Sequence, residues 1–327
     1  MLKKLKLILL GLISLLALAS CSEEKGADII VTNYVGYDFV REVTKDVEDI
    51  SYSMLLKPGS KVHGYEPSSK DIRDILSCKL FIYVGGESDS QWVEKSILPK
   101  IDYSKTKVIN MFTVLENNNG LLVNEEDPAS ADEEEEGEEE EYDEHVWNDI
   151  DNALIILNAI ATELKVIYPD YQSAFENNSA SYQVGLREVD QQIIGLCNSK
   201  QKKTMIFADR FPLLYFVNRY GLSYDACFKG CSTQIEASRN SIMSLASKVE
   251  ENNSKYIFVI ELSDKRNANT ILSVIKDDIN AGRYSGEEPQ VLTFYSMHNV
   301  SVEDFNSKKS YLDYMRANLA SLRLLLE

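Results

Sequence analysis

The chain has 327 residues and a formal net charge of −18 at pH 7, which argues against nucleic acid as a partner. Without the leader described below, about 300 residues remain, which is long for one hydrophobic core and suits two lobes. After the leader, no segment reaches the roughly 18 consecutive apolar residues that a membrane-spanning helix requires.

Residues 1–20 are predicted to be a lipoprotein signal peptide. Three lysines among the first six residues precede an apolar run at 7–18, and small residues then lead to Cys21. A positive start, a short apolar core and small residues before the cut are typical of secretory signals. The place of the cysteine resembles a bacterial lipobox, so Cys21 is expected to carry a lipid that anchors the protein at the extracytoplasmic face of the cell membrane. Residues 21–26 would then be a short polar tether.

Beyond the tether, short apolar runs alternate with segments of helical period. This alternation is typical of α/β proteins with mostly parallel sheets. The predicted strands span 28–32, 54–56, 80–84, 108–111, 204–207, 256–260 and 291–295. Gly85-Gly86 fits a tight strand-to-helix turn better than a phosphate-binding loop, because no Lys-Ser/Thr pair follows it.

An acidic segment at 125–144 interrupts the first half of the chain. Fourteen of its twenty residues are acidic and none is basic. Such a composition cannot bury enough apolar surface to order itself, so we expect a mobile surface loop.

A long helix is predicted within 168–202. Its apolar or small residues recur at steps of three and four, which is one stripe of an α-helix. The stripe consists of Tyr171, Phe175, Ser179, Tyr182, Leu186, Val189, Ile193 and Leu196. We therefore expect an α/β fold of two lobes, 27–167 and 203–327, each with a mostly parallel sheet flanked by helices, joined by this one rigid helix. Such a helix would limit hinge opening, so that only small lobe and loop movements are expected.

Two of the three histidines lie just before predicted helix starts in the first lobe. His63 follows a predicted strand and precedes Ser68 and Asp71, which have the spacing of a capping box. His145 lies before a helix that Asn148 could cap, and Trp147 could pack beside its imidazole ring. The apolar face of that helix would be Ile150, Leu154, Leu157, Ala161 and Leu164.

The second lobe offers three more candidates at the ends of predicted strands. His298 follows the last strand, Asp209 follows the strand 204–207, and Glu261 ends the strand 256–260. Ligands of open α/β sheets bind at the edge where strands end. Three imidazoles with one carboxylate would make a tetrahedral zinc site, and either Asp209 or Glu261 could supply the oxygen. For each of the two acids, a salt bridge in the cleft is an alternative role.

Several segments resemble one known family. In order, they are VTNYVGYDFVREV, PGSKVHGYEPSSKDI, LFIYVGGESDSQWV, EHVWNDIDNA and FPLLYFVNRYGL. They look like the solute-binding lipoproteins of zinc and manganese ABC transporters, of cluster A-I type. The resemblance implies two α/β lobes bridged by a long helix, a metal in the cleft, and His63 and His145 as ligands. It also implies that the acidic segment replaces a His-rich loop, either gathering cations weakly or serving as a solvated spacer.

The resemblance fails in the second lobe. The place of the usual third ligand is held by Arg210, and the usual late acidic ligand region aligns near Tyr295-Ser296 without an acid. Placement at strand ends favours His298 and Glu261 as substitutes, with Asp209 as a third candidate. Zn²⁺ is favoured over Mn²⁺ because manganese prefers more oxygen donors.

The sequence thus favours a monomeric, non-enzymatic binding protein that captures a divalent metal and delivers it to the permease of an ABC importer. Affinity should fall as pH drops through the histidine range, because only neutral imidazole binds metal. A zinc hydrolase with Glu66 or Glu261 as base is a second hypothesis, although no GxSxG or HExxH motif is present. A surface adhesin that uses the acidic run is a third. The state of Cys78, Cys197, Cys227 and Cys231 stays open between free and paired structural cysteines.

Overall fold

The computed structural model describes residues 26–60, 64–124, 142–200, 204–228 and 237–326. The predicted signal peptide, Cys21 and His63 lie outside these ranges, as does the acidic segment up to residue 141.

The first half of the chain forms a four-stranded parallel sheet, as the apolar runs predict. Its strands are β1 (Ile29–Val31), β2 (Tyr52–Met54), β3 (Leu80–Tyr83) and β4 (Lys107–Asn110), in the order β2-β1-β3-β4. The strand expected at 54–56 begins two residues earlier, because Tyr52 rather than Met54 pairs with the first residue of β1.

The second half forms another parallel sheet of four strands. It contains β5 (Thr204–Phe207), β6 (Ser223–Ala226), β7 (Tyr256–Val259) and β8 (Gln290–Thr293), in the order β6-β5-β7-β8. The strand β6 was not predicted from the sequence. It is an edge strand with exposed and half-buried side chains, so it lacks the apolar run by which the other strands are recognised.

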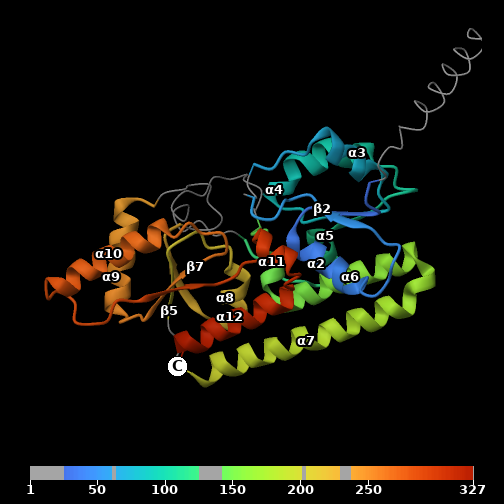
Figure 1. Cartoon of the computed structure of the whole chain (residues 1–327). Coiled ribbons are helices and arrows are strands. Elements are labelled where there is room, and N and C mark those ends of the chain that lie inside the picture. Colours follow the sequence, from blue (N-terminus) through green and yellow to red (C-terminus); the bar gives the residue numbers. More distant parts are fainter. Residues whose placement is uncertain (1–25, 61–63, 125–141, 201–203, 229–236, 327) are drawn as a thin grey trace, which may run out of the picture.

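Helices cover both faces of both sheets (Figure 1). The helices are α2 (Tyr34–Val43), α3 (Ser69–Ser77), α4 (Glu87–Asp89), α5 (Met111–Asn117), α6 (Ile150–Ile167), α7 (Gln172–Ser199), α8 (Leu214–Tyr220), α9 (Arg239–Glu251), α10 (Arg266–Asn280), α11 (Val302–Asn306) and α12 (Tyr311–Leu326). Shorter helical turns are η1 (Ser90–Ile97), η2 (Leu98–Lys100), η3 (Val146–Asn148) and η4 (Pro169–Tyr171).

The two sheets share one hydrophobic core. This core contains Ile29 and Val31 of β1 together with Phe207 of β5 and Phe258 of β7, and the helices between the sheets fill it. Two smaller cores lie on the outer faces, one under α3 and η1 and one under α9 and α10. The layers therefore read helix, sheet, helix, sheet, helix, with the central helical layer common to both sheets.

The predicted long helix is confirmed as α7, which has 28 residues. The middle of its predicted stripe, from Phe175 to Ile193, is buried, and the stripe's two ends are half-buried. In Figure 1, α7 runs beneath both sheets with α12 alongside it. Because α12 belongs to the C-terminal segment yet packs its Tyr311 ring against Phe39 of α2, the division of the chain into 27–167, 168–202 and 203–327 stays a prediction.

Local capping fixes the helices that follow the two metal-candidate loops. Ser68 and Asp71 form the predicted capping box of α3. At α6 the cap is Asp149, not the expected Asn148, because residues Val146–Asn148 form a 3₁₀ turn first. Asn148 instead donates a hydrogen bond to the carbonyl oxygen of Pro212, 2.8 Å away. The predicted apolar face of α6 is buried.

A buried hydrogen-bond network ties the central helices together. The hydroxyl of Tyr182 on α7 donates to Asp38 Oδ2 on α2 at 2.7 Å and accepts from the backbone N–H of Leu312 on α12 at 3.0 Å. Asp38 Oδ2 also accepts from the Tyr311 backbone N–H at 2.9 Å. One buried phenol thus joins three helices.

Replacing this hydroxyl tests how much the network contributes. Tyr182→Phe leaves the buried Leu312 N–H without its acceptor, and we expect the free energy of unfolding to fall by about 1–3 kcal/mol. Urea unfolding followed by circular dichroism measures it. Tyr103→Phe, at a side chain that is 58% exposed, is the matched control and should change little. Equal stability of the two variants would show that the network contributes nothing.

Candidate metal centre

His145 is held in one orientation by its own loop. Asp143 Oδ1 accepts a hydrogen bond from the His145 backbone N–H at 2.8 Å and lies 3.0 Å from His145 Nδ1. A carboxylate at this position binds the Nδ1–H tautomer, so the lone pair of Nε2 points away from Asp143. The side chain is buried. This carboxylate–imidazole pair is the arrangement that orients metal-binding histidines.

Trp147 packs beside the imidazole, as the sequence predicts. The two rings meet edge to face with centroids 5.5 Å apart. The indole Nε1–H donates to the carbonyl oxygen of Ser296 at 2.8 Å, and the carbonyl oxygen of Trp147 accepts from the Tyr311 hydroxyl at 2.6 Å. Trp147 therefore connects the loop of His145 to the loop that carries His298.

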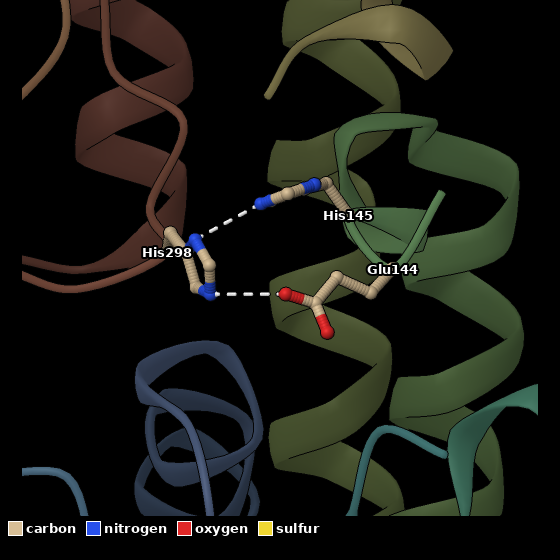
Figure 2. Close-up of side chains that lie close together, drawn as sticks. All are labelled: Glu144, His145 and His298. Atoms are coloured by element: carbon tan, nitrogen blue, oxygen red, sulfur yellow. Dashed lines mark hydrogen bonds and ion pairs between the residues drawn. The ribbon is translucent and has the colours of Figure 1, made fainter. Parts of the chain in front are cut away.

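His298 lies against both His145 and Glu144 (Figure 2). Its Nδ1 is 2.9 Å from His145 Nε2, and its Nε2 is 3.6 Å from Glu144 Oε1. The side chains of His298 and Glu144 are each 11% exposed. The structure thus brings two of the three predicted histidines together from loops 153 residues apart.

Glu261 lies beneath the His298 loop and supports it. Its Oε1 accepts from the Ser296 hydroxyl at 2.6 Å and from the His298 backbone N–H at 3.0 Å. Its Oε2 accepts from the Ser296 backbone N–H at 2.8 Å. Burial raises the pKa of Glu261, while these hydrogen bonds favour the carboxylate. Both carboxylate oxygens of Glu261 accept hydrogen bonds from the His298 loop, so the geometry favours a role in positioning that loop. The role of Glu261 as a metal ligand stays a prediction.

Asp209 is also engaged elsewhere. Its Oδ2 accepts from the backbone N–H of Ile260 at 3.1 Å, and Ser263 donates a side-chain hydrogen bond to it. Burial raises the pKa of Asp209. The contact braces the end of β7, one residue before Glu261, and a ligand role for Asp209 remains a prediction.

Glu144 is the residue that sequence reasoning missed. In the sequence it is the last acid of the acidic segment at 125–144, and it directly precedes His145. Its Oε1 accepts from the Ser88 hydroxyl at 2.8 Å, and its Oε2 accepts from the Ser88 backbone N–H at 3.2 Å. One donor atom from each of Glu144, His145 and His298 lies within 4.8 Å of the others. The sequence signal for Glu144 is its position next to a histidine in a loop that precedes a helix.

The chemistry of these donors fits a transition metal. Two imidazoles and a carboxylate are borderline ligands that suit Zn²⁺, and their partial burial reduces competition from water. Zinc–nitrogen bonds of about 2.0–2.1 Å in a tetrahedral site place two nitrogens roughly 3.3 Å apart. The separation of 2.9 Å between His145 Nε2 and His298 Nδ1 is that of a hydrogen bond. For both rings to bind one ion, the His298 ring would have to turn a lone pair toward it, and the two nitrogens would lie a few tenths of an ångström farther apart.

The donor cluster opens into a cavity on the side of the first sheet. The cavity encloses about 390 Å³ of space, including some open to solvent. Its lining comprises Thr32, Asn33, Leu56, Tyr65, Val84, Ser88, Asp89, Trp92, Glu144, Trp147 and His298. Burial raises the pKa of Asp89 to about 7, and the nearby Glu144 carboxylate adds to this rise. A cation entering the cavity would therefore meet two adjacent carboxyl groups.

The segment that leads to His63 is tied to the same place. The Asn299 side-chain amide donates to the carbonyl oxygens of Lys57 at 3.0 Å and Ser60 at 2.7 Å. The backbone N–H of Gly59 donates to the carbonyl oxygen of Val300 at 2.7 Å. These hydrogen bonds join two chain segments, and each segment leads to a predicted ligand. Asn299 directly follows His298, and Ser60 lies three residues before His63.

Taken with the fold, this donor set defines a class: α/β proteins with two parallel sheets and a candidate transition-metal centre where their loops meet. The chain belongs to the family described as ZnuA, zinc-uptake complex component A, periplasmic, whose model matches residues 29–324. Proteins of this family are binding components of transport systems, not enzymes, which removes the support for a zinc hydrolase.

Individual relatives agree with this assignment. The chain is 30% identical over 326 residues to the zinc-binding lipoprotein AdcA of Streptococcus pneumoniae. The aligned region covers 98% of this chain and 60% of AdcA. It is 28% identical over 300 residues to the high-affinity zinc uptake system protein ZnuA of Bacillus subtilis, covering 90% and 86% of the two chains. The chain therefore spans about 60% of the length of the first of these relatives.

A solved structure shows the same fold. Zn(II)-bound AdcA from Streptococcus pneumoniae superposes with a TM-score of 0.69 at 25% identity, over 92% of this chain and 58% of that one. Within the described part of the chain, we find no helix with the length and apolar character of a membrane span.

The two second-lobe carboxylates can be separated by mutation. We expect Glu261→Ala to lower metal affinity about 10–100-fold, because three hydrogen bonds that position the His298 loop are lost. Asp209→Ala should lower thermal stability but leave affinity within a few-fold of wild type. Competition titration with a chromogenic zinc chelator measures both. If Asp209→Ala lost more zinc affinity than Glu261→Ala, Asp209 would be closer to the metal than Glu261 is, which would contradict this prediction.

Asp143 offers a test of the orientation of His145. Asp143→Ala removes the acceptor for Nδ1–H and should weaken zinc binding about 10–100-fold. Asp143→Asn keeps a carbonyl acceptor of the same shape but loses the charge, so its loss should be smaller. The same titration ranks the three proteins, and an alanine variant that binds as tightly as wild type contradicts the orienting role.

Proposed function

We propose that this protein captures Zn²⁺ outside the cytoplasm and delivers it to the permease of an ABC importer. The observation that carries the proposal is the buried Glu144–His145–His298 cluster in a chain that belongs to a family of zinc-uptake components. The ion is cargo, so the site has to bind it tightly enough to collect it and still release it to a partner.

Zinc is the metal that these donors favour. Manganese prefers sites richer in oxygen, whereas imidazole nitrogen with one carboxylate oxygen suits tetrahedral zinc. The names of the relatives AdcA and ZnuA also refer to zinc. We propose His63 as a fourth ligand, on the strength of the HGYEP segment and of the hydrogen bonds that hold residues 57–60 beside the His298 loop. A shell of four protein ligands leaves no water position, which suits binding and not hydrolysis.

Capture would proceed with small movements of side chains and loops. Before metal binds, one proton lies between His145 Nε2 and His298 Nδ1, because two bare lone pairs would not approach to 2.9 Å. A cation that takes the lone pair of His145 Nε2 breaks this hydrogen bond, and His298 turns a lone pair toward the ion. Asp143 keeps its hydrogen bond to His145 Nδ1 throughout, so the first ligand needs no rearrangement.

The remaining parts of the proposal concern the place and partners of the protein. A lipid on Cys21 would hold it at the outer face of the cell membrane, in agreement with the lipoprotein relative. We also propose that the protein acts as a monomer and delivers the ion to a membrane permease, and the description of the family as a component of a zinc-uptake complex supports the second part.

Elemental analysis and zinc titration of untagged protein lacking residues 1–21 test the proposal. We expect one Zn²⁺ per chain and tighter binding of Zn²⁺ than of Mn²⁺. Glu144→Ala, His145→Ala, His298→Ala and His63→Ala should each weaken zinc binding at least 10-fold, because each removes a donor.

Glu116→Ala, at an exposed carboxylate on α5, is the matched control and should bind like wild type. Tighter binding of Mn²⁺ than of Zn²⁺ would favour the manganese-specific alternative. Wild-type zinc affinity in both His145→Ala and His298→Ala would refute the assignment of the site.

A further inference from the structure

The segment between β3 and η1, which includes the single helical turn α4, holds Glu144 at both of its carboxylate oxygens; it is called the Ser88 loop below. Ser88 is the residue that makes both contacts, with its hydroxyl on Oε1 at 2.8 Å and its backbone N–H on Oε2 at 3.2 Å. A single residue that donates to both oxygens occupies the edge of the carboxylate where a chelating cation would sit. The remaining lone pairs of the two oxygens point away from each other.

Gly86 lets the glutamate approach this loop. A Cβ atom at position 86 would lie 2.6 Å from Glu144 Cβ and 3.1 Å from Glu144 Oε2. The first distance is shorter than any ordinary contact between carbon atoms, so a side chain here would displace Glu144. The Gly85-Gly86 pair, interpreted from sequence as a tight turn, therefore also forms one wall of the seat of the Glu144 carboxylate.

The Ser88 loop is itself firmly held, so it can impose a position on Glu144. Asp89 Oδ2 accepts from the Val84 backbone N–H at 2.7 Å and from the Thr32 hydroxyl at 3.3 Å. The indole Nε1–H of Trp92 donates to the carbonyl oxygen of Ser88 at 3.2 Å. These bonds fix Ser88 from both sides, and the loop cannot follow a carboxylate that rotates.

We infer that Ser88 is a positioning residue that limits Glu144 to binding metal through one oxygen, and that it thereby favours Zn²⁺ over Mn²⁺. The inference rests on the proposed function of the same site. Of the two oxygens, Oε1 faces the other donors, because it lies 3.6 Å from His298 Nε2 and keeps a second lone pair beside its hydrogen bond from the Ser88 hydroxyl. One oxygen with imidazoles completes a tetrahedral shell for zinc, whereas manganese gains from a second oxygen that Ser88 withholds.

Ser88→Ala tests the inference because it removes one of the two hydrogen bonds and frees Oε1 to rotate. We expect zinc affinity to fall about 10-fold and manganese affinity to stay the same or rise, so that the Zn²⁺/Mn²⁺ affinity ratio falls at least 10-fold. Ser88→Thr keeps the hydroxyl and should restore the wild-type ratio. Competition titrations with both metals measure the ratio.

Two further measurements separate positioning from a merely structural role. The visible absorption of bound Co²⁺ should weaken in Ser88→Ala, because a second carboxylate oxygen raises the coordination number above four. The thermal midpoint of metal-free Ser88→Ala should stay close to that of wild type. Gly86→Ala, which pushes on Glu144 from the other side, should also lower zinc affinity.

A double-mutant cycle shows whether Ser88 acts through Glu144. In the Glu144→Ala background, Ser88→Ala should change neither the affinity ratio nor the Co²⁺ spectrum. An unchanged ratio in Ser88→Ala alone, or an equal effect in both backgrounds, overturns the inference while the proposed function stands. Wild-type protein that binds no zinc overturns the proposed function, and this inference with it.

Discussion

The loop of residues 296–300 is the constraint on which the site depends, because it is held from both halves of the chain. From the second half, Glu261 accepts three hydrogen bonds from Ser296 and His298. From the first half, Trp147 donates to the Ser296 carbonyl oxygen. The position of His298 relative to His145 is therefore held by contacts of the protein itself. A metal site built from distant segments needs such preorganisation, since otherwise the ion would have to offset the entropy of ordering the loop.

The charges around the site favour a cation over an anion. Three carboxyl groups surround the two imidazoles. Asp143 contacts His145 and Glu144 lies beside His298, and the Glu144 carboxylate adds to the raised pKa of Asp89. Like charges brought together under partial burial raise the free energy of the metal-free state, and a divalent ion removes this cost. The hydrogen bonds from Ser88 and from the Val84 backbone N–H oppose this cost.

The sequence predicted the fold because the chain's apolar runs and helical stripes have clear periods. Both parallel sheets and α7 follow from them, and β6 was missed because an edge strand with a polar sequence carries no such period. The proximity of His145 and His298 followed from their places at the ends of strands and the start of a helix, where parallel sheets collect their loops.

The other site residues were harder to predict for physical reasons. Glu144 is chemically identical to its neighbours in the acidic run, and only the fold shows that it meets Ser88 and His298. Glu261 and Asp209 lie at a strand end, as ligands often do, yet backbone N–H groups there compete for the same carboxylate oxygens. A one-dimensional pattern places a carboxylate near a site, but it does not show which donor its oxygens will accept.

The shared helical layer sets the scale of movement that metal capture can use. Helices α7 and α12 pack together across both sheets, and the Tyr182 hydroxyl links them to α2 inside a common core. Separating the halves widely would expose this core and break buried hydrogen bonds, at a cost far above that of turning a side chain. The hydrogen bond between His145 and His298 already spans the two halves at 2.9 Å. Because a zinc ion would need its two nitrogens only slightly farther apart, a His298 ring that turns its free lone pair toward the ion would keep the halves at nearly the same separation. On this argument, the proposed capture of the ion would involve side chains and loops, and we expect the outer surface of the protein to differ little between the metal-free and metal-bound states.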